Sequence, residues 1–144
     1  MSVNSGKRIR VVLLWIQILD KLEPFYKDYG EFFFTAKVHT HGETHQYRLP
    51  QEGHWEISDH PRLNKVDKID KILFEGEPGD DLVVEFLGEE IDKFTENDHL
   101  DDYRREFSGD AAAWVARYAP GDEGSDDPEN MSNWRIGYEI QLLG

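Results

Sequence analysis

The sequence predicts an all-β fold, an antiparallel β-sandwich of about eight strands, with seven to nine as the range. Short apolar runs rich in β-branched and aromatic residues recur along the chain, and turn residues separate them roughly every 8 to 12 positions. The last run alternates strictly between apolar and polar residues. At 144 residues, the chain has the length of one domain, residues 1–144, with a flexible N-terminus over residues 1–7.

The first strand is expected at residues 9–19, where an apolar, β-branched run suits a central strand buried on both faces. The final strand, 134–143, places Trp134, Ile136 and Tyr138 on one face and polar residues on the other. Between them we expect strands at 31–40, 45–49, 54–57, 68–75 and 82–87.

Residues 98–119 fit a strand less well than the rest of the chain. Leu100, Tyr103 and Phe107 have the spacing of a helix face, and three consecutive alanines follow at 111–113. We therefore expect one short helix around residues 98–118.

The charge of the chain is concentrated in one segment. The formal net charge is -14, and residues 77–130 hold 18 of the 30 acidic residues but 4 of the 16 basic ones. Phosphate binding needs clustered lysine and arginine, so nucleic acid is not an expected partner. A local acidic concentration is typical of a solubilising surface or of a cation site.

The sequence contains no cysteine, which excludes disulfides, thiolate metal sites and a cysteine nucleophile. The basic start at residues 7–10 precedes an apolar run that is too short to span a bilayer and lacks a small-residue cleavage site. We therefore expect no transmembrane segment and a cytoplasmic location.

The segment after residue 82 carries the most informative pattern. Residues 82–86 (LVVEF) form a strand that runs into an acidic loop with carboxylates at Glu90, Asp92 and Asp98. Ca²⁺ takes six to eight oxygen ligands, so such a site needs several carboxylates that converge from loops. The strand and the following segment 92–100 (DKFTENDHL) resemble the third calcium loop of the C2 domain family of calcium-dependent membrane-binding β-sandwiches.

The resemblance implies a C2-like sandwich with Ca²⁺ ligands in loops at one end. It places Asp92 and Asp98 at ligand positions, and Glu90 where the family usually has aspartate. The family's first loop is similar to residues 19–31. The implied ligands from that loop are Asp20, with Asp28 or Glu31 as the second, and the implied contacts with a membrane or partner are Phe25, Tyr26 and Phe94.

The catalytic motifs that we considered, a nucleophile elbow, a phosphate loop and a zinc-protease helix, are absent from the sequence. The first hypothesis is therefore a non-enzymatic module that binds Ca²⁺ and then recognises a phospholipid surface or a protein partner. Two alternatives stay open. One is an acidic assembly sandwich that binds no ion and steers a basic protein partner, and the other is a carbohydrate-binding sandwich with a tryptophan platform.

Overall fold

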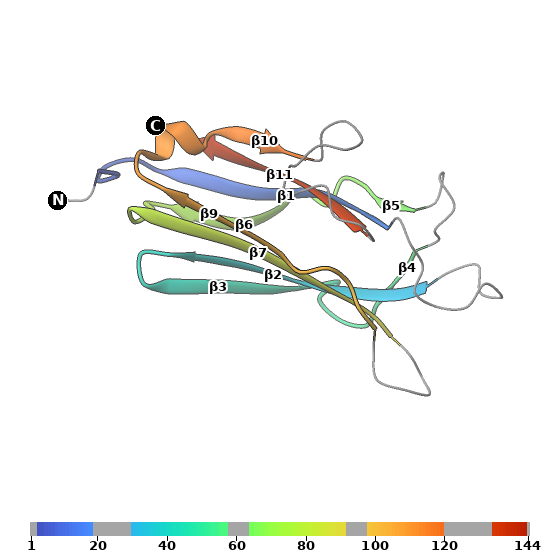
Figure 1. The fold of residues 1–144 in the computed structure, drawn as a ribbon. Helices are drawn as coiled ribbons and strands as arrows, with labels where there is room; N and C mark the ends of the chain where they lie inside the picture. The colour runs from blue at the N-terminus through green and yellow to red at the C-terminus, as the bar shows by residue number, and fades with distance from the viewer. Residues whose placement is uncertain (1–2, 19–29, 58–63, 92–97, 120–133, 144) are drawn as a thin grey trace.

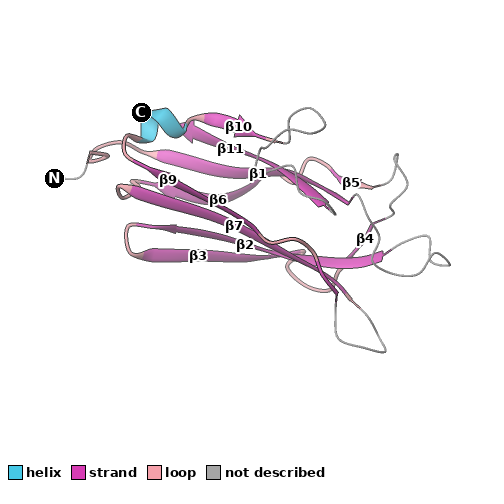
Figure 2. Ribbon diagram, in the orientation of Figure 1, coloured by secondary structure: helices cyan, strands magenta, loops and turns pink. Residues whose placement is uncertain are grey.

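The computed structural model describes residues 3–18, 30–57, 64–91, 98–119 and 134–143, and it confirms the predicted β-sandwich. Two antiparallel sheets lie face to face (Figures 1 and 2). The described residues form eleven strands, all in these two sheets, and one 3₁₀ helix, η1 (Ala111–Trp114). The strand count exceeds the expected seven to nine because several strands, such as β5 and β8, are two residues long.

The first sheet has the order β10-β11-β1-β5, and β6 also pairs with β1. Its strands are β1 (Ile9–Ile18), β5 (Lys65–Val66), β6 (Lys71–Gly76), β10 (Ala116–Tyr118) and β11 (Trp134–Leu142).

The second sheet has the order β3-β2-β7-β8, with β4 also pairing with β2 and β9 with β7. Its strands are β2 (Gly30–Thr40), β3 (Glu43–Leu49), β4 (Trp55–Ile57), β7 (Asp81–Glu90), β8 (Asp98–His99) and β9 (Tyr103–Ser108).

A register shift in β1 explains why its sequence is apolar almost throughout. The pairing of β1 with β11 shifts between Leu13 and Trp15, so Leu13 and Ile16 both face the core and both are fully buried. Trp15 lies on the outer face, where the Nζ atom of Lys65 is 4.5 Å from its ring centroid. The outer face of β1 is thus half-buried under side chains, and within the described residues no third layer covers it.

The core lies between the sheets and is built largely from aromatic residues. The largest fully buried side chains are Trp134, Tyr103, Tyr138, Phe32, Phe34 and Phe86. The rings of Phe34 and Trp134 stack across the two sheets with centroids 5.2 Å apart. The hydroxyls of Tyr103 and Tyr138 lie 2.6 Å apart in a hydrogen bond, which offsets the cost of burying them.

The expected helix around 98–118 is confined to the single turn of η1, because the preceding segment forms β9. Tyr103 and Phe107 do share a face, but as alternate residues of a strand with Arg105 between them. The Arg105 guanidinium carbon lies 4.7 Å from the centroid of the Tyr118 ring and 5.3 Å from that of Phe107. A charged residue at an inner position therefore concealed the alternation in the sequence.

Asn4, which lies within the segment 1–7 expected to be flexible, is fully buried. Its Nδ2 donates hydrogen bonds to the carbonyl oxygens of Gly79 and Gly109, at 2.8 and 2.9 Å. Its Oδ1 accepts a hydrogen bond from the amide of Ala111 at 2.7 Å. One side chain thereby joins the N-terminal segment to two turns that are distant in sequence.

Candidate cation-binding end of the sandwich

Four strand termini meet at the end of the sandwich opposite the two chain termini (Figure 1). They are the last residues of β1, β4 and β7 and the first residue of β2, namely Ile18, Ile57, Glu90 and Gly30. We call this region the loop end. The segment predicted as the first calcium loop joins β1 to β2, and the segment predicted as the third follows β7 and leads into β8, so both begin at the same end of the fold.

Most of the predicted site lies outside the described residues. This holds for the ligand candidates Asp20, Asp28 and Asp92 and for the contact candidates Phe25, Tyr26 and Phe94. The backbone of Asp98 belongs to β8 and pairs with Glu90. These roles stay predictions.

Glu90 ends β7 with its side chain on the inner face of the sheet, and it is fully buried. Its Oε2 atom lies next to Gly30, where an added Cβ would be only 2.4 Å away. The absence of a side chain at Gly30 thus leaves room for the Glu90 carboxylate. The buried Glu90 carboxylate thus lies at the loop end, beside the first residue of β2.

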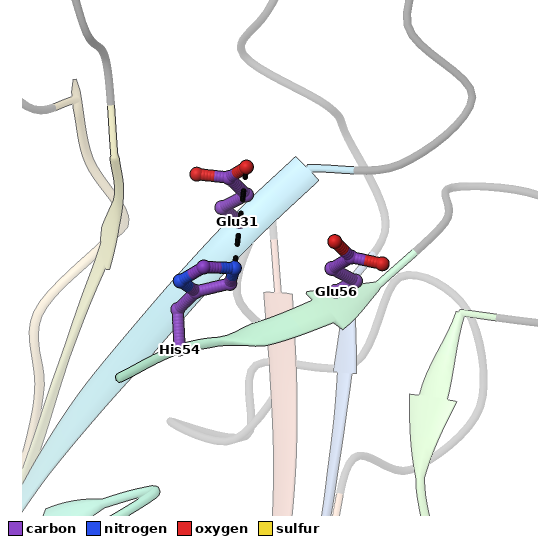
Figure 3. Close-up of side chains that lie close together, drawn as sticks. All are labelled: Glu31, His54 and Glu56. Carbon is purple, nitrogen blue, oxygen red and sulfur yellow. Dashed lines mark ion pairs between the residues drawn. The ribbon is translucent and has the colours of Figure 1, made fainter. Parts of the chain in front are cut away.

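Glu31, the neighbouring residue to Gly30, faces the opposite side of the second sheet. It pairs across strands with Glu56, and its Oε1 atom lies 3.9 Å from Nε2 of His54 (Figure 3). One ligand atom from each of these three residues lies within 4.8 Å of the others. The structure thus brings Glu31 together with His54 and Glu56 on the outer face, and it places Glu90 on the inner face.

Sequence reasoning missed His54, Glu56 and the role of Gly30. His54 and Glu56 are two positions apart in a segment that was predicted as a strand, so a shared face could have been inferred. Their proximity to Glu31 could not, because it depends on the pairing of β4 with the first residues of β2.

A second polar network lies on the outer face of the same sheet, toward the other end. The His39 ring contacts Thr44 Oγ1 through Nδ1 at 2.8 Å and Glu85 Oε2 through Nε2 at 2.9 Å. Glu85 also accepts a hydrogen bond from Arg104 at 3.1 Å. The hydrogen bond from His39, with a further contribution from Arg104, lowers the pKa of Glu85 below its ordinary value.

The four tryptophans do not form an exposed platform of the kind that a carbohydrate-binding sandwich would need. Trp114 and Trp134 are buried in the core, at 3% and 0% exposure. Trp15 is half-buried beside Lys65, and Trp55 is half-buried in a groove at the edge of the sandwich. These positions give the carbohydrate hypothesis no support.

Comparison with known proteins gives a likeness in structure alone. A structure of human GIVD cytosolic phospholipase A2 in complex with methyl γ-linolenyl fluorophosphonate matches 94% of this chain, with a TM-score of 0.51 and 12% identity. This likeness supports a C2-like fold. A second structure of that phospholipase, with the same inhibitor and terbium chloride, matches 94% of the chain at 13% identity and a TM-score of 0.46. The match spans 17% of the phospholipase chain in each case.

No protein-family model matches the sequence, and no curated protein matches it. Among the described residues, no helix has both the length and the apolar character needed to cross a bilayer.

Proposed function

We propose that this chain is a non-enzymatic C2-like module that binds Ca²⁺ at the loop end and thereby recognises a phospholipid surface or a protein partner. The observation that carries the proposal is the fully buried carboxylate of Glu90 at the end of the sandwich where both predicted calcium loops begin. The C2-like fold supports the same placement, since it agrees with the resemblance found in the sequence.

The residues of this end fit the chemistry of calcium. Ca²⁺ is a hard cation that prefers carboxylate and carbonyl oxygens. Glu90 supplies a buried carboxylate, and Asp20, Asp92 and Asp98 are the further proposed ligands. The backbone of Asp98 pairs with Glu90, which fixes where the chain returns to the sheet after the predicted third loop.

The proposed mechanism is electrostatic. Each Ca²⁺ offsets two negative charges, so binding shifts the potential of the loop end toward neutral and leaves coordination positions for an oxygen of the partner. Phe25, Tyr26 and Phe94 would then enter the interface as apolar contacts. The net charge of -14 opposes attraction to bulk anionic lipid, so a protein surface suits the chain better than a lipid surface.

Thermal unfolding with EDTA, with Ca²⁺ and with Mg²⁺ tests the proposal directly. A ligand at a hundred times its Kd stabilises the folded state by about 2.7 kcal/mol. For a domain of this size, that corresponds to a rise in Tm of roughly 5–10 °C. We expect this rise with Ca²⁺ and a much smaller one with Mg²⁺.

Paired variants assign the effect to the predicted loop. The double substitution Asp92→Asn with Asp98→Asn should abolish the calcium-dependent rise. A matched control, Asp81→Asn with Asp102→Asn, removes two exposed acids from the same acidic segment and should keep it. A wild-type Tm that does not respond to Ca²⁺ would contradict the proposal. In that case a Tm that rises in the first double variant without Ca²⁺ would favour the acidic assembly sandwich.

A further inference from the structure

We propose that Glu31, His54 and Glu56 form a separate metal site for a divalent transition-metal ion of the Zn²⁺ type. This site lies on the outer face of the second sheet and is distinct from the proposed calcium site. The two sites use different residues and different faces, so either can exist without the other.

The backbone positions of the three residues bring their side chains close together on one face of the sheet. Glu31 and Glu56 are direct partners in the antiparallel pairing of β2 and β4. His54 precedes Glu56 by two positions, and its ring projects toward the same region (Figure 3). The three ligand atoms already lie within 4.8 Å of one another, and the His54 Nε2 to Glu31 Oε1 distance is 3.9 Å.

A metal ion would require only a small contraction of this cluster. With metal–ligand bonds near 2.1 Å and tetrahedral angles, ligand atoms around Zn²⁺ lie roughly 3.4 Å apart. Side-chain rotation can supply the difference from the present distances, because His54 and Glu56 are at least one-third exposed and Glu31 is partly exposed. Two of the three ligands belong to paired strands, which hold their positions more firmly than a loop does.

The charges of the cluster supply an independent reason for a cation. Glu31 and Glu56 lie directly opposite each other, and like charges in that arrangement destabilise a sheet. Within the described residues, no lysine or arginine forms an ion pair with either carboxylate, and the contact of Glu31 with His54 is the ion pair that the site contains. A divalent cation bound between the carboxylates would convert this repulsion into attraction.

The ligand set selects the kind of metal. An imidazole nitrogen with two carboxylates suits Zn²⁺ and its transition-metal neighbours, whereas Ca²⁺ and Mg²⁺ prefer sites made of oxygen alone. Three protein ligands leave one tetrahedral position for water or for a donor group from a partner molecule. The site therefore has the composition of an open metal site.

Calorimetric titration with ZnCl₂, in buffer that contains excess Ca²⁺, measures the site without relying on any activity. We expect one Zn²⁺ per chain. The variants Glu31→Gln, His54→Ala and Glu56→Gln should each weaken binding by at least about tenfold. His99→Ala is the matched control, because His99 is an exposed histidine of the same sheet that contacts the carboxylate of Glu89. It should bind Zn²⁺ as the wild type does.

Thermal unfolding in EDTA checks that the metal-free variants are folded, and Glu56→Asp provides a second, conservative variant that should retain part of the affinity. Wild-type affinity in His54→Ala, or an equal loss in His99→Ala, would overturn the proposal. The double variant Asp92→Asn with Asp98→Asn separates the two sites, because it should lose the response to Ca²⁺ and keep the Zn²⁺ site.

Discussion

The contact between Gly30 and Glu90 leads to a quantitative prediction about the loop end. In Gly30→Ala, the new Cβ would lie 2.4 Å from Glu90 Oε2 and 2.5 Å from the nearest ring atom of Phe32. Both neighbours are fully buried, so one of them must move. Overpacking of this kind costs about 1–3 kcal/mol, which lowers the Tm of a domain this size by roughly 3–10 °C. The Glu90 carboxylate is the more flexible neighbour, and its displacement should also weaken Ca²⁺ binding.

The assay is thermal unfolding of Gly30→Ala with EDTA and with Ca²⁺, alongside a control with a similar steric defect. Gly88→Ala is suitable, because its Cβ would lie 2.6 Å from Leu100 Cδ1 and no carboxylate is among the nearest contacts. Both variants should lose stability in EDTA, but only Gly30→Ala should lose most of the rise in Tm caused by Ca²⁺. A wild-type Tm for Gly30→Ala would refute the steric argument, and a full calcium response would refute the role of Glu90.

Three further predictions follow from the described contacts. Asn4→Ala removes three hydrogen bonds that a fully buried side chain makes with the backbone, and we expect urea unfolding to show a loss of about 3 kcal/mol. The hydrogen bond with His39 lowers the pKa of Glu85, so the ionised carboxylate stabilises the folded state. This stabilisation is fully present at pH values above about 4.5 and is lost as the pH falls through the lowered pKa. The stability difference between wild type and Glu85→Gln should therefore shrink in the acid range, and a difference independent of pH would contradict the assignment. In Gly137→Ala, the Cβ would lie 2.3 Å from the ring of Trp15, so this ring should move. Tryptophan emission should then change in the wild-type background and stay unchanged in a Trp15→Phe background.

The strands that could be predicted from the sequence are those with a clear local pattern. β11 alternates between inner and outer residues without interruption, and the expected span of 134–143 differs from the observed strand by one residue. β9 was missed because Arg105 occupies an inner position and interrupts the apolar alternation. The stacking of Arg105 on Tyr118 requires β10 to lie nearby, and a local pattern does not contain that information.

In the candidate sites too, a local pattern indicated one part and strand pairing decided the other. The resemblance in residues 82–100 pointed to Glu90 and to a C2-like fold, and the structure places Glu90 at the end where the predicted loops begin. By contrast, Glu31 and Glu56 are 25 positions apart in the sequence, and they become neighbours because β2 pairs with β4.

The sequence by itself determined the sandwich class, most of the long strands and the location of the acidic segment. These features are local, because side-chain alternation and composition act over a few neighbouring residues. Only the tertiary structure decided which faces the carboxylates occupy, with Glu90 inside and Glu31 outside beside His54. One step along a strand reverses the face of a side chain, and strand pairing then chooses its neighbours from distant parts of the chain.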